Sequence, residues 1–250
     1  MADAGWDIAI TDISTKACQV YGESTSIEEI LKNLGTRGAQ AKFYEADLTD
    51  EKQAIALCAK VEKEFGPIQA LVALAGGDIS GTDNDAAGGK APKNTAFVDS
   101  ENFHAIFDRN FLSCVYACRA ATPFMVSRGM GKVITFASVS AGFGVSQETA
   151  YAVAKAGVAH FTRCLASELR PDGINVNCLA PGGTNTGRFR ATLKDRTEAD
   201  LKRLEAQGRL ERVGEPEDVC KVIEFFLSSA SNFISGQVLR IDGGQFTGPI

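Results

Sequence analysis

Short apolar runs rich in β-branched residues alternate along this chain with longer stretches whose apolar positions recur every three or four residues. Such alternation is typical of βαβ units around a parallel sheet, because buried strands read as continuous apolar runs while the covering helices are amphipathic. The pattern predicts strands at 7–12, 42–46, 70–74, 132–137, 174–179 and 237–241. It predicts helices at 26–35, 51–65, 101–127, 147–170, 197–206 and 216–228, some of them introduced by the capping residues Ser26, Asp50 and Ser100. The expected fold class is α/β, with a three-layer, doubly wound parallel sheet.

One segment, 76–92, fits neither kind of element, because its sequence GGDISGTDNDAAGGKAP is too rich in glycine, aspartate and alanine. It follows the predicted strand 70–74 and should therefore lie at the carboxyl ends of the strands, where open α/β sheets bind ligands. Two interpretations remain open: a loop on the surface, or a lid on the substrate side of a site.

The composition narrows the class of protein. A chain of 250 residues, 44% of them hydrophobic, can bury one α/β core, so we expect a single domain over 1–250. No apolar run approaches the roughly 20 residues that span a membrane, and a soluble protein without a membrane partner is expected. The net charge of -5 argues against nucleic acid as a partner, because a phosphate backbone is bound by clustered Lys and Arg.

The seven cysteines form no C-x-x-C pair and lie in segments predicted to be core, so buried free thiols are expected. Cys114 and Cys118 stand one helical turn apart, but with only two histidines in the chain a zinc site lacks ligands, and no metal is expected. The odd number of cysteines and the lack of a secretion signal favour a reducing cytoplasm.

The residues most suggestive of chemistry are Tyr151 and Lys155, four residues apart in the predicted helix 147–170, so that their side chains share one face. A lysine cation beside a phenol favours the phenolate and lowers the pKa of the phenol toward the range useful for proton transfer. Ser138 follows the predicted strand 132–137, where its hydroxyl could hydrogen-bond a substrate oxygen. Together they predict an acid–base site, although a tyrosine and a lysine at this spacing also occur as a surface pair.

A longer motif surrounds these residues. The run FASVSAGFGVSQETAYAVAKAG, with Ser138 13 positions before Tyr151, resembles the active site of the short-chain dehydrogenase/reductase family. Asn110, 28 positions before Ser138, falls where that family keeps the asparagine of its catalytic tetrad. The resemblance implies a Rossmann-type fold. It implies that Tyr151 is the general acid and base, and that Lys155 lowers its pKa and binds the nicotinamide ribose. It also implies that Ser138 orients the substrate oxygen and that Asn110 holds a water in a proton relay.

The same resemblance, which runs from about residue 5 to 245, implies the cofactor contacts. INVNCLAPGGTNT is similar to the family's strand and turn beside the nicotinamide, with Pro181, Gly182 and Thr186 in place, and the tail GQVLRIDGG is similar to its last strand. Asp12 matches the acidic residue that accepts the adenosine ribose hydroxyls and prefers NAD to NADP. Asp47 matches the aspartate on the adenine side.

The chain departs from the family pattern at two places. Family members open with a strand, a T-G-x-x-x-G-x-G turn and a helix whose amino end receives the cofactor pyrophosphate. MADAGWDIAITDIS aligns instead with the end of that helix and the second strand, so we expect an N-terminally truncated fold that lacks the first βα unit, roughly 30 residues. In addition, the family's Asn-Ala-Gly is here Leu74-Ala75-Gly76.

The first departure has a consequence for the sheet. In the family's strand order 3-2-1-4-5-6-7 the first strand is central, and its loss would leave two neighbours about 10 Å apart with unpaired backbone. We expect that the strand 7–12 shifts toward 70–74, giving one sheet of six strands and covering part of the cofactor site.

The leading hypothesis is a cofactor-deficient subunit of an NAD-dependent alcohol or hydroxyacyl-CoA dehydrogenase. NAD is expected in the assembled enzyme and not in this chain. Because family members usually form tetramers through the helices that correspond to 101–127 and 147–170, the expected partner is a full-length homologue in a heterotetramer. The second of these helices should turn part of its apolar stripe toward that subunit: Ala150, Ala154, Val158, Phe161 and Leu165.

Two alternatives remain. One is an active NAD-dependent short-chain dehydrogenase in its own right, whose glycine-rich loop would lie upstream of this sequence. The other is a non-enzymatic binding module that uses the old substrate pocket for a CoA ester or a regulator. The tetrad residues are accordingly either functional or relics. The small-molecule substrate, for which a CoA ester is one candidate, has no recognisable code in 76–92 or 183–212.

Overall fold

The computed structural model describes the chain at residues 1–22, 24, 26–77, 95–146, 148–191, 198–206 and 208–248. Nearly all of the predicted loop 76–92 lies outside the described residues, so neither interpretation of that loop is tested.

All six predicted strands form, and every one of their ends lies within two residues of the expected position. They are β1 (Ile8–Asp12), β2 (Ala41–Glu45), β3 (Ala70–Ala73), β4 (Gly131–Phe136), β5 (Ile174–Pro181) and β6 (Val238–Ile241). All their pairings are parallel. In the part of the chain that the structure describes, the strands make two sheets, with the orders β1-β2 and β3-β4-β5-β6.

The prediction of one closed sheet is therefore wrong, because β1 does not bond to β3. The layers on both faces hold the two sheets in place. The helix after β2 is tied to the layer under the larger sheet by Arg128, whose guanidinium donates to both carboxylate oxygens of Glu62 at 3.0 and 2.9 Å. On the other face Met1 and Trp6 pack against the same apolar cluster as Ala70 and Val72 of β3, a cluster that includes Ile134 and Phe136. Closing the sheet would require these packed layers to move.

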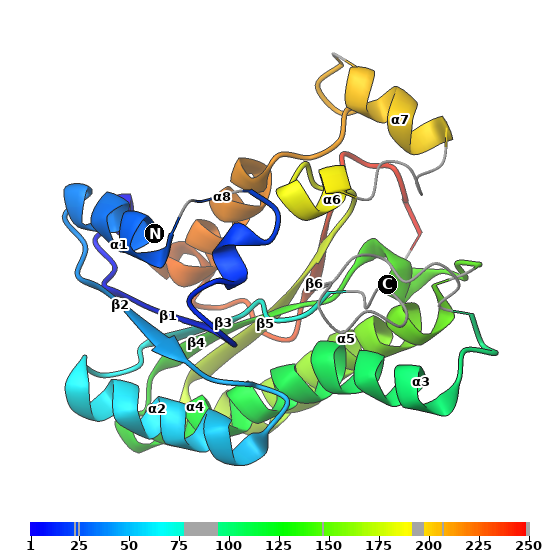
Figure 1. Ribbon diagram of the computed structural model, residues 1–250. Helices are drawn as coiled ribbons and strands as arrows, with labels where there is room; N and C mark the ends of the chain where they lie inside the picture. Colours follow the sequence, from blue (N-terminus) through cyan, green and yellow to red (C-terminus); the bar gives the residue numbers. More distant parts are fainter. Residues whose placement is uncertain are drawn as a thin grey trace.

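The helices cover both faces of the sheets (Figure 1). One layer holds α2 (Glu51–Glu64), α3 (Ser100–Phe107), α4 (Ser113–Arg128) and α5 (Thr149–Leu169). The other holds α1 (Ile27–Thr36), α6 (Gly187–Ala191) and α8 (Pro216–Leu227), while α7 (Glu198–Glu205) stands at the upper edge. The three-layer α/β architecture agrees with the expectation from the sequence.

Two helical predictions need correction. The expected helix 101–127 is divided into α3 and α4 by a π-helical segment, Asp108–Leu112, which turns Asn110 toward the end of β3. The stripe Ala150, Ala154, Val158 and Leu165 does not face another subunit, because these residues are buried within the chain itself. Phe161 packs edge-on against Phe111 of the π-helical segment.

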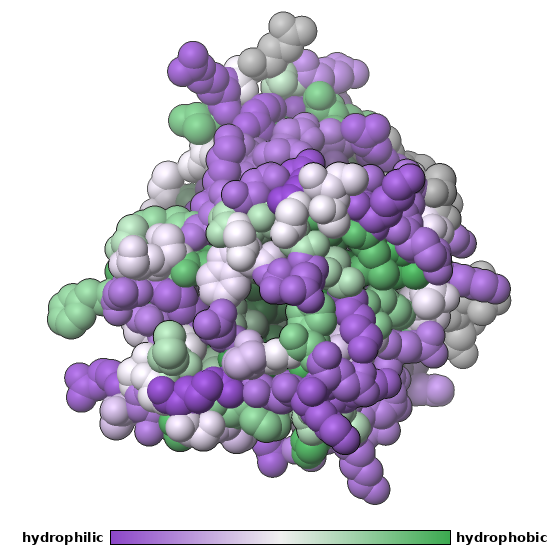
Figure 2. Space-filling view, turned by 90° about the vertical axis from the view of Figure 1, so that its left-hand side faces the viewer, coloured by the Kyte–Doolittle hydropathy of each residue, from purple (hydrophilic) through white to green (hydrophobic). Residues whose placement is uncertain are grey.

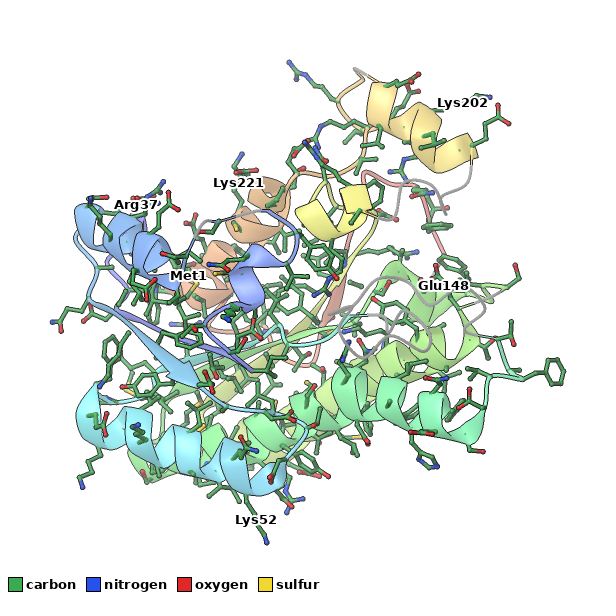
Figure 3. The ribbon with its side chains drawn as sticks, viewed as in Figure 1. Met1, Arg37, Lys52, Glu148, Lys202 and Lys221 are labelled. Carbon is green, nitrogen blue, oxygen red and sulfur yellow. The ribbon has the colours of Figure 1, made fainter. Side chains whose placement is uncertain are left out.

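The amino terminus is also part of the packed structure. Met1 lies between α1 and α8, where its amino group donates to Glu224 of α8 at 3.1 Å (Figure 3). Among the described residues, no helix combines the length and the apolar character needed to cross a bilayer.

Candidate active site

Lys155 is the central buried charge of the site. It lies in the middle of α5 and is 5% exposed. Its ammonium group donates to the carbonyl oxygen of Phe136, the last residue of β4, at 2.9 Å. Burial lowers the pKa of Lys155 to about 8, since the charged form loses its hydration, and the nearby Arg188 cation acts in the same direction. A lysine with this pKa can both hold and release a proton near neutral pH.

Tyr151 lies one helical turn before Lys155 and is half-buried. The Lys155 ammonium nitrogen is 5.8 Å from the centre of the Tyr151 ring, so the two groups share one face of α5 as the sequence predicts. The pair has the arrangement needed for general acid–base work on a substrate oxygen.

Ser138 lies two residues after the end of β4 and is the N-cap of the short 3-10 helix Val139–Gly142. Its hydroxyl oxygen accepts from the backbone N–H of Ser140 at 3.2 Å and donates to the Ser140 hydroxyl at 3.3 Å. Ser140 in turn donates to Glu148, just before α5, at 3.3 Å. Ser138 is therefore held by a chain of polar groups that reaches the start of the tyrosine helix, which sequence reasoning did not anticipate.

Asn110 is fully buried, and both the nitrogen and the oxygen of its side-chain amide make hydrogen bonds. Its amide nitrogen donates to the carbonyl oxygens of Gly77 at 2.7 Å and Ile106 at 3.0 Å. Its amide oxygen accepts from the N–H of Gly77 at 2.8 Å. The side chain thus fixes the chain that leaves β3. The π-helical segment makes this contact, because it offsets Asn110 from the regular helical path.

The stretch Gly76–Gly77, which we name the glycine strap, crosses the site after β3. Both residues have positive φ, 150° and 140°, which side-chain-bearing residues rarely adopt. A Cβ on Gly76 would lie 3.0 Å from the Asn110 oxygen and 3.3 Å from the Lys155 ammonium. On Gly77 a Cβ would collide with Arg188. Glycine is favoured at both positions, because a side chain would be strained at these φ values and would crowd the neighbouring polar groups.

Arg188, at the start of α6, also contacts the glycine strap. Its guanidinium donates to the carbonyl oxygen of Gly76 at 2.9 Å and lies 5.4 Å from the ring centre of Tyr21. Sequence reasoning missed Arg188, Tyr21 and the strap. The pair of glycines after a buried strand was the one signal that could have indicated the strap.

The predicted cofactor contacts lie at three places. Asp12 ends β1 and accepts from the N–H of Ile13 at 2.7 Å, while Asp47 accepts from Thr49. Pro181 ends β5, and the N–H of Gly182 donates to Ile241 at 2.9 Å. Thr186 accepts from the N–H of Phe189 and introduces α6. The structure brings Lys155, Asn110 and the glycine strap together, and it places Asp12 and Asp47 at the ends of the other sheet.

These residues fit a nicotinamide dinucleotide only in part. By the family resemblance, Lys155, the Pro181–Gly182 turn and Thr186 would hold the nicotinamide half of the cofactor. The T-G-x-x-x-G-x-G pattern, whose N–H groups receive the pyrophosphate in the family, does not occur in the 250 residues. Leu74, which stands where the family has an asparagine, is 60% exposed.

The chain is similar in sequence to known reductases and dehydrogenases. A family model described as enoyl-(acyl carrier protein) reductase matches residues 1–245. The chain is 30% identical to a cyclohexanol dehydrogenase of Rhodococcus sp. (strain TK6), over 98% of this chain and 88% of that protein. It is 28% identical to the 7alpha-hydroxysteroid dehydrogenase of Escherichia coli K12, over 97% of this chain and 90% of that protein.

Solved structures of dehydrogenases are also similar to this chain. A gluconate 5-dehydrogenase from Burkholderia cenocepacia, in complex with NADP and tartrate, has a TM-score of 0.79 at 27% identity, over 97% of this chain and 86% of that one. A 7 alpha-hydroxysteroid dehydrogenase, complexed with NADH and 7-oxo glycochenodeoxycholic acid, has a TM-score of 0.81 at 25% identity, over 98% and 86%. With these matches and the Ser138, Tyr151 and Lys155 arrangement, the chain belongs to the short-chain dehydrogenase/reductase family.

Proposed function

We propose that this chain is a cofactor-deficient subunit of an NAD-dependent short-chain alcohol dehydrogenase, which supports a complete homologue that carries out the oxidation. The observation that carries the proposal is a division within one site. On one face of α5 lie the half-buried Tyr151 and the buried Lys155, the proton-transfer residues of the family, whereas the 250 residues do not contain the T-G-x-x-x-G-x-G turn that holds the cofactor pyrophosphate in the family.

The hydrogen bonds to the pyrophosphate contribute strongly to cofactor affinity. Each hydrogen bond to a charged phosphate is worth roughly 1.5–3 kcal/mol, so losing several of them reduces affinity by orders of magnitude. The nicotinamide, where bound, supplies the hydride acceptor. In this chain Lys155 still holds a proton at its ammonium nitrogen, and Tyr151 still offers a phenol on the same face of α5. These groups can bind and orient a substrate oxygen without the redox step.

The substrate of the assembled enzyme is proposed to be a secondary alcohol, in keeping with the cyclohexanol and 7alpha-hydroxysteroid named for the relatives. A two-subunit enzyme of the proposed kind is the 2-[hydroxy(phenyl)methyl]succinyl-CoA dehydrogenase of anaerobic toluene degradation. We propose that this chain resembles its shorter subunit, and that a CoA ester is the substrate.

Calorimetric titration tests the proposal. The 250-residue chain titrated with NAD should show no binding at micromolar concentrations, and the complete homologue, titrated in parallel, should bind. Circular dichroism of the same sample confirms that the chain is folded. A micromolar dissociation constant for the chain alone would refute the proposal, because a cofactor held that tightly needs an intact phosphate site.

A second candidate is an active short-chain dehydrogenase in its own right, and the buried Lys155 favours it. A lysine with a pKa near 8 is costly to keep in a core, and in an active enzyme it has a use. Replacing Tyr151 by Phe separates the two candidates. A supporting subunit predicts nearly unchanged activity of the assembled complex, whereas the same change in the complete homologue should lower the rate by about 10²–10⁴-fold. A loss of that size from Tyr151→Phe would establish this chain as catalytic.

A further inference from the structure

The Ser138 hydroxyl lies at one end of a chain of three side chains that begins at Glu148. Glu148 stands at the amino end of α5 (Figure 3) and accepts a hydrogen bond from the Ser140 hydroxyl at 3.3 Å. A second hydroxyl contact, also of 3.3 Å, joins Ser140 to Ser138. Each serine is only 8% exposed, so water has little access to either hydroxyl as an alternative partner.

The chemistry of these groups fixes the direction of the chain. A glutamate carboxylate has acceptor atoms only, so the proton in its contact with Ser140 comes from the serine. Ser140 has one hydroxyl proton, and its oxygen therefore offers a lone pair toward Ser138. The Ser138 hydroxyl must donate to that lone pair, which commits its own single proton to the inside of the chain.

The remaining capacity of the Ser138 oxygen is that of an acceptor. One of its two lone pairs accepts from the backbone N–H of Ser140 at 3.2 Å, and nothing in the part of the chain that the structure describes takes the other. A ligand oxygen that reaches Ser138 meets this lone pair and has to bring a proton with it. An alcohol hydroxyl brings one, whereas a ketone oxygen has lone pairs only.

We propose that Glu148 is a positioning residue that acts through Ser140, makes the Ser138 hydroxyl a hydrogen-bond acceptor, and so makes this site select an alcohol over the matching ketone. A ketone gains a bond to Ser138 only when that hydroxyl turns its proton outward and gives up its bond to the buried Ser140 oxygen. One neutral hydrogen bond of this kind changes an equilibrium constant about fivefold. The alcohol loses nothing, because its hydroxyl can donate to Ser138 and accept from the Tyr151 phenol.

This inference deepens the proposed function and rests on one part of it, the binding of a substrate oxygen by this chain at Ser138 and Tyr151. It does not rest on the loss of the cofactor. An alcohol whose proton points to Ser138 is held in place, whereas a general base would need the same proton directed at the Tyr151 oxygen. The direction of the chain thus favours holding an alcohol over removing its proton.

The binding of two matched ligands tests the proposal. Cyclohexanol and cyclohexanone share one ring size and differ at the oxygen that Ser138 meets, and cyclohexanol is named for one of the relatives. Each is titrated into the folded 250-residue protein without NAD, while NMR follows the amide of Ser140, whose N–H bonds to Ser138. The quantity compared between variants is the ratio of the two dissociation constants, because contacts with the ring cancel in it.

Glu148→Gln keeps the shape of the side chain and adds an N–H donor. The amide can then donate to Ser140 and Ser140 to Ser138, so that Ser138 turns its proton toward the ligand. The preference for the alcohol should fall by about fivefold, through tighter binding of the ketone.

Glu168→Gln is the matched control, because it removes the same charge from an exposed position in the last turn of the same helix. From the site, α5 runs back along the sheet, so this turn lies toward the amino ends of the strands. That is the face shown in Figure 2, where many hydrophilic residues are exposed. Glu168→Gln should leave the ratio unchanged.

Ser140→Ala separates an action through the chain from a general effect of the Glu148 charge. Without the Ser140 hydroxyl the chain is interrupted, so this substitution should lower the preference for the alcohol as Glu148→Gln does. The two substitutions together should have no larger effect than either alone, because they remove the same interaction. Circular dichroism and urea midpoints establish that each variant is folded.

Three outcomes would overturn the proposal. One is a ratio that Glu148→Gln leaves unchanged in the folded protein. Another is additive effects of Glu148→Gln and Ser140→Ala, because Glu148 would then act by a route other than Ser140. Both of these leave the proposed function standing. The third is the absence of saturable binding of either ligand, which would also remove the substrate site from the proposed function.

Discussion

At the scale of single residues, Lys155 shows how a position that is easy to find in the sequence acquires its property from the fold. Its spacing from Tyr151 is visible in the sequence. Its pKa is not, because the lowering to about 8 comes from complete burial, assisted by Arg188, a residue 33 positions away along the chain. The same burial makes Lys155 a source of pH-dependent stability.

We predict that Lys155→Met stabilises the chain at pH 7 and loses that advantage at high pH. The pKa of Lys155 rises from about 8 when folded to 10.5 when unfolded, a difference of about 3 kcal/mol. Below pH 8 the full penalty of burying the cation is present. Between pH 8 and 10.5 the unfolded state binds more protons, so the stability of the unsubstituted chain rises with pH relative to the variant.

Urea unfolding at pH 7 and pH 10.5 measures this difference. The variant also loses the hydrogen bond to Phe136, worth about 1 kcal/mol, so it should be more stable by roughly 2 kcal/mol at pH 7 and slightly less stable at pH 10.5. Lys52→Met, at an exposed position of α2, controls for the loss of a lysine as such (Figure 3). A stability difference that does not change with pH would contradict the assignment.

At the scale of elements, the glycine strap links β3, the π-helical segment and α6. Asn110 holds Gly77 through both of its backbone groups, and Arg188 holds Gly76. No pattern of hydrophobic positions reports such a link, because it is made of polar contacts between elements distant in sequence. The hydrophobic pattern likewise predicts a continuous helix across Asp108–Leu112, because it does not report the polar contacts of Asn110 that go with the π-helical segment.

We expect Gly77→Ala to destabilise the chain by roughly 1–3 kcal/mol, since its φ of 140° is strained for alanine and the added methyl group meets Arg188. Gly144→Ala is the matched control, because a Cβ there has nothing within 4 Å and φ is not positive. Urea midpoints of the two variants provide the measurement. Equal midpoints would mean that the strap is not constrained as described.

At the scale of the whole molecule, the proposed function requires a contact surface other than the stripe on α5, because that stripe is buried within the chain. The outward side of α5 borders a shallow pocket of about 220 Å³, lined by Phe143, Val145, Ala152, Val153 and Ala156 among others. Val153 is 50% exposed there. An apolar hollow beside an exposed apolar residue suits a helix of a homologous subunit.

The proposed function predicts that this chain and a complete homologue sediment together as a stable complex, and that Val153→Glu weakens the complex at least tenfold by burying a charge. Ile55→Glu, at a position of α2 that is 54% exposed, should have no such effect. A monodisperse monomer that ignores the homologue at micromolar concentration would argue against the subunit proposal and for a binding module.

The strands, most of the helices and the family could be predicted from the sequence, because they depend on local periodicity and on motifs such as the run from Ser138 to Lys155. Strand pairing, the contacts that hold Ser138 and Asn110, and the buried faces of the helices depend on the tertiary structure. The division between β1 and β3 shows the reason. Strand pairing depends on layers packed from segments far apart in the chain, among them Glu62 with Arg128 and Met1 with Glu224, and no local pattern contains that information.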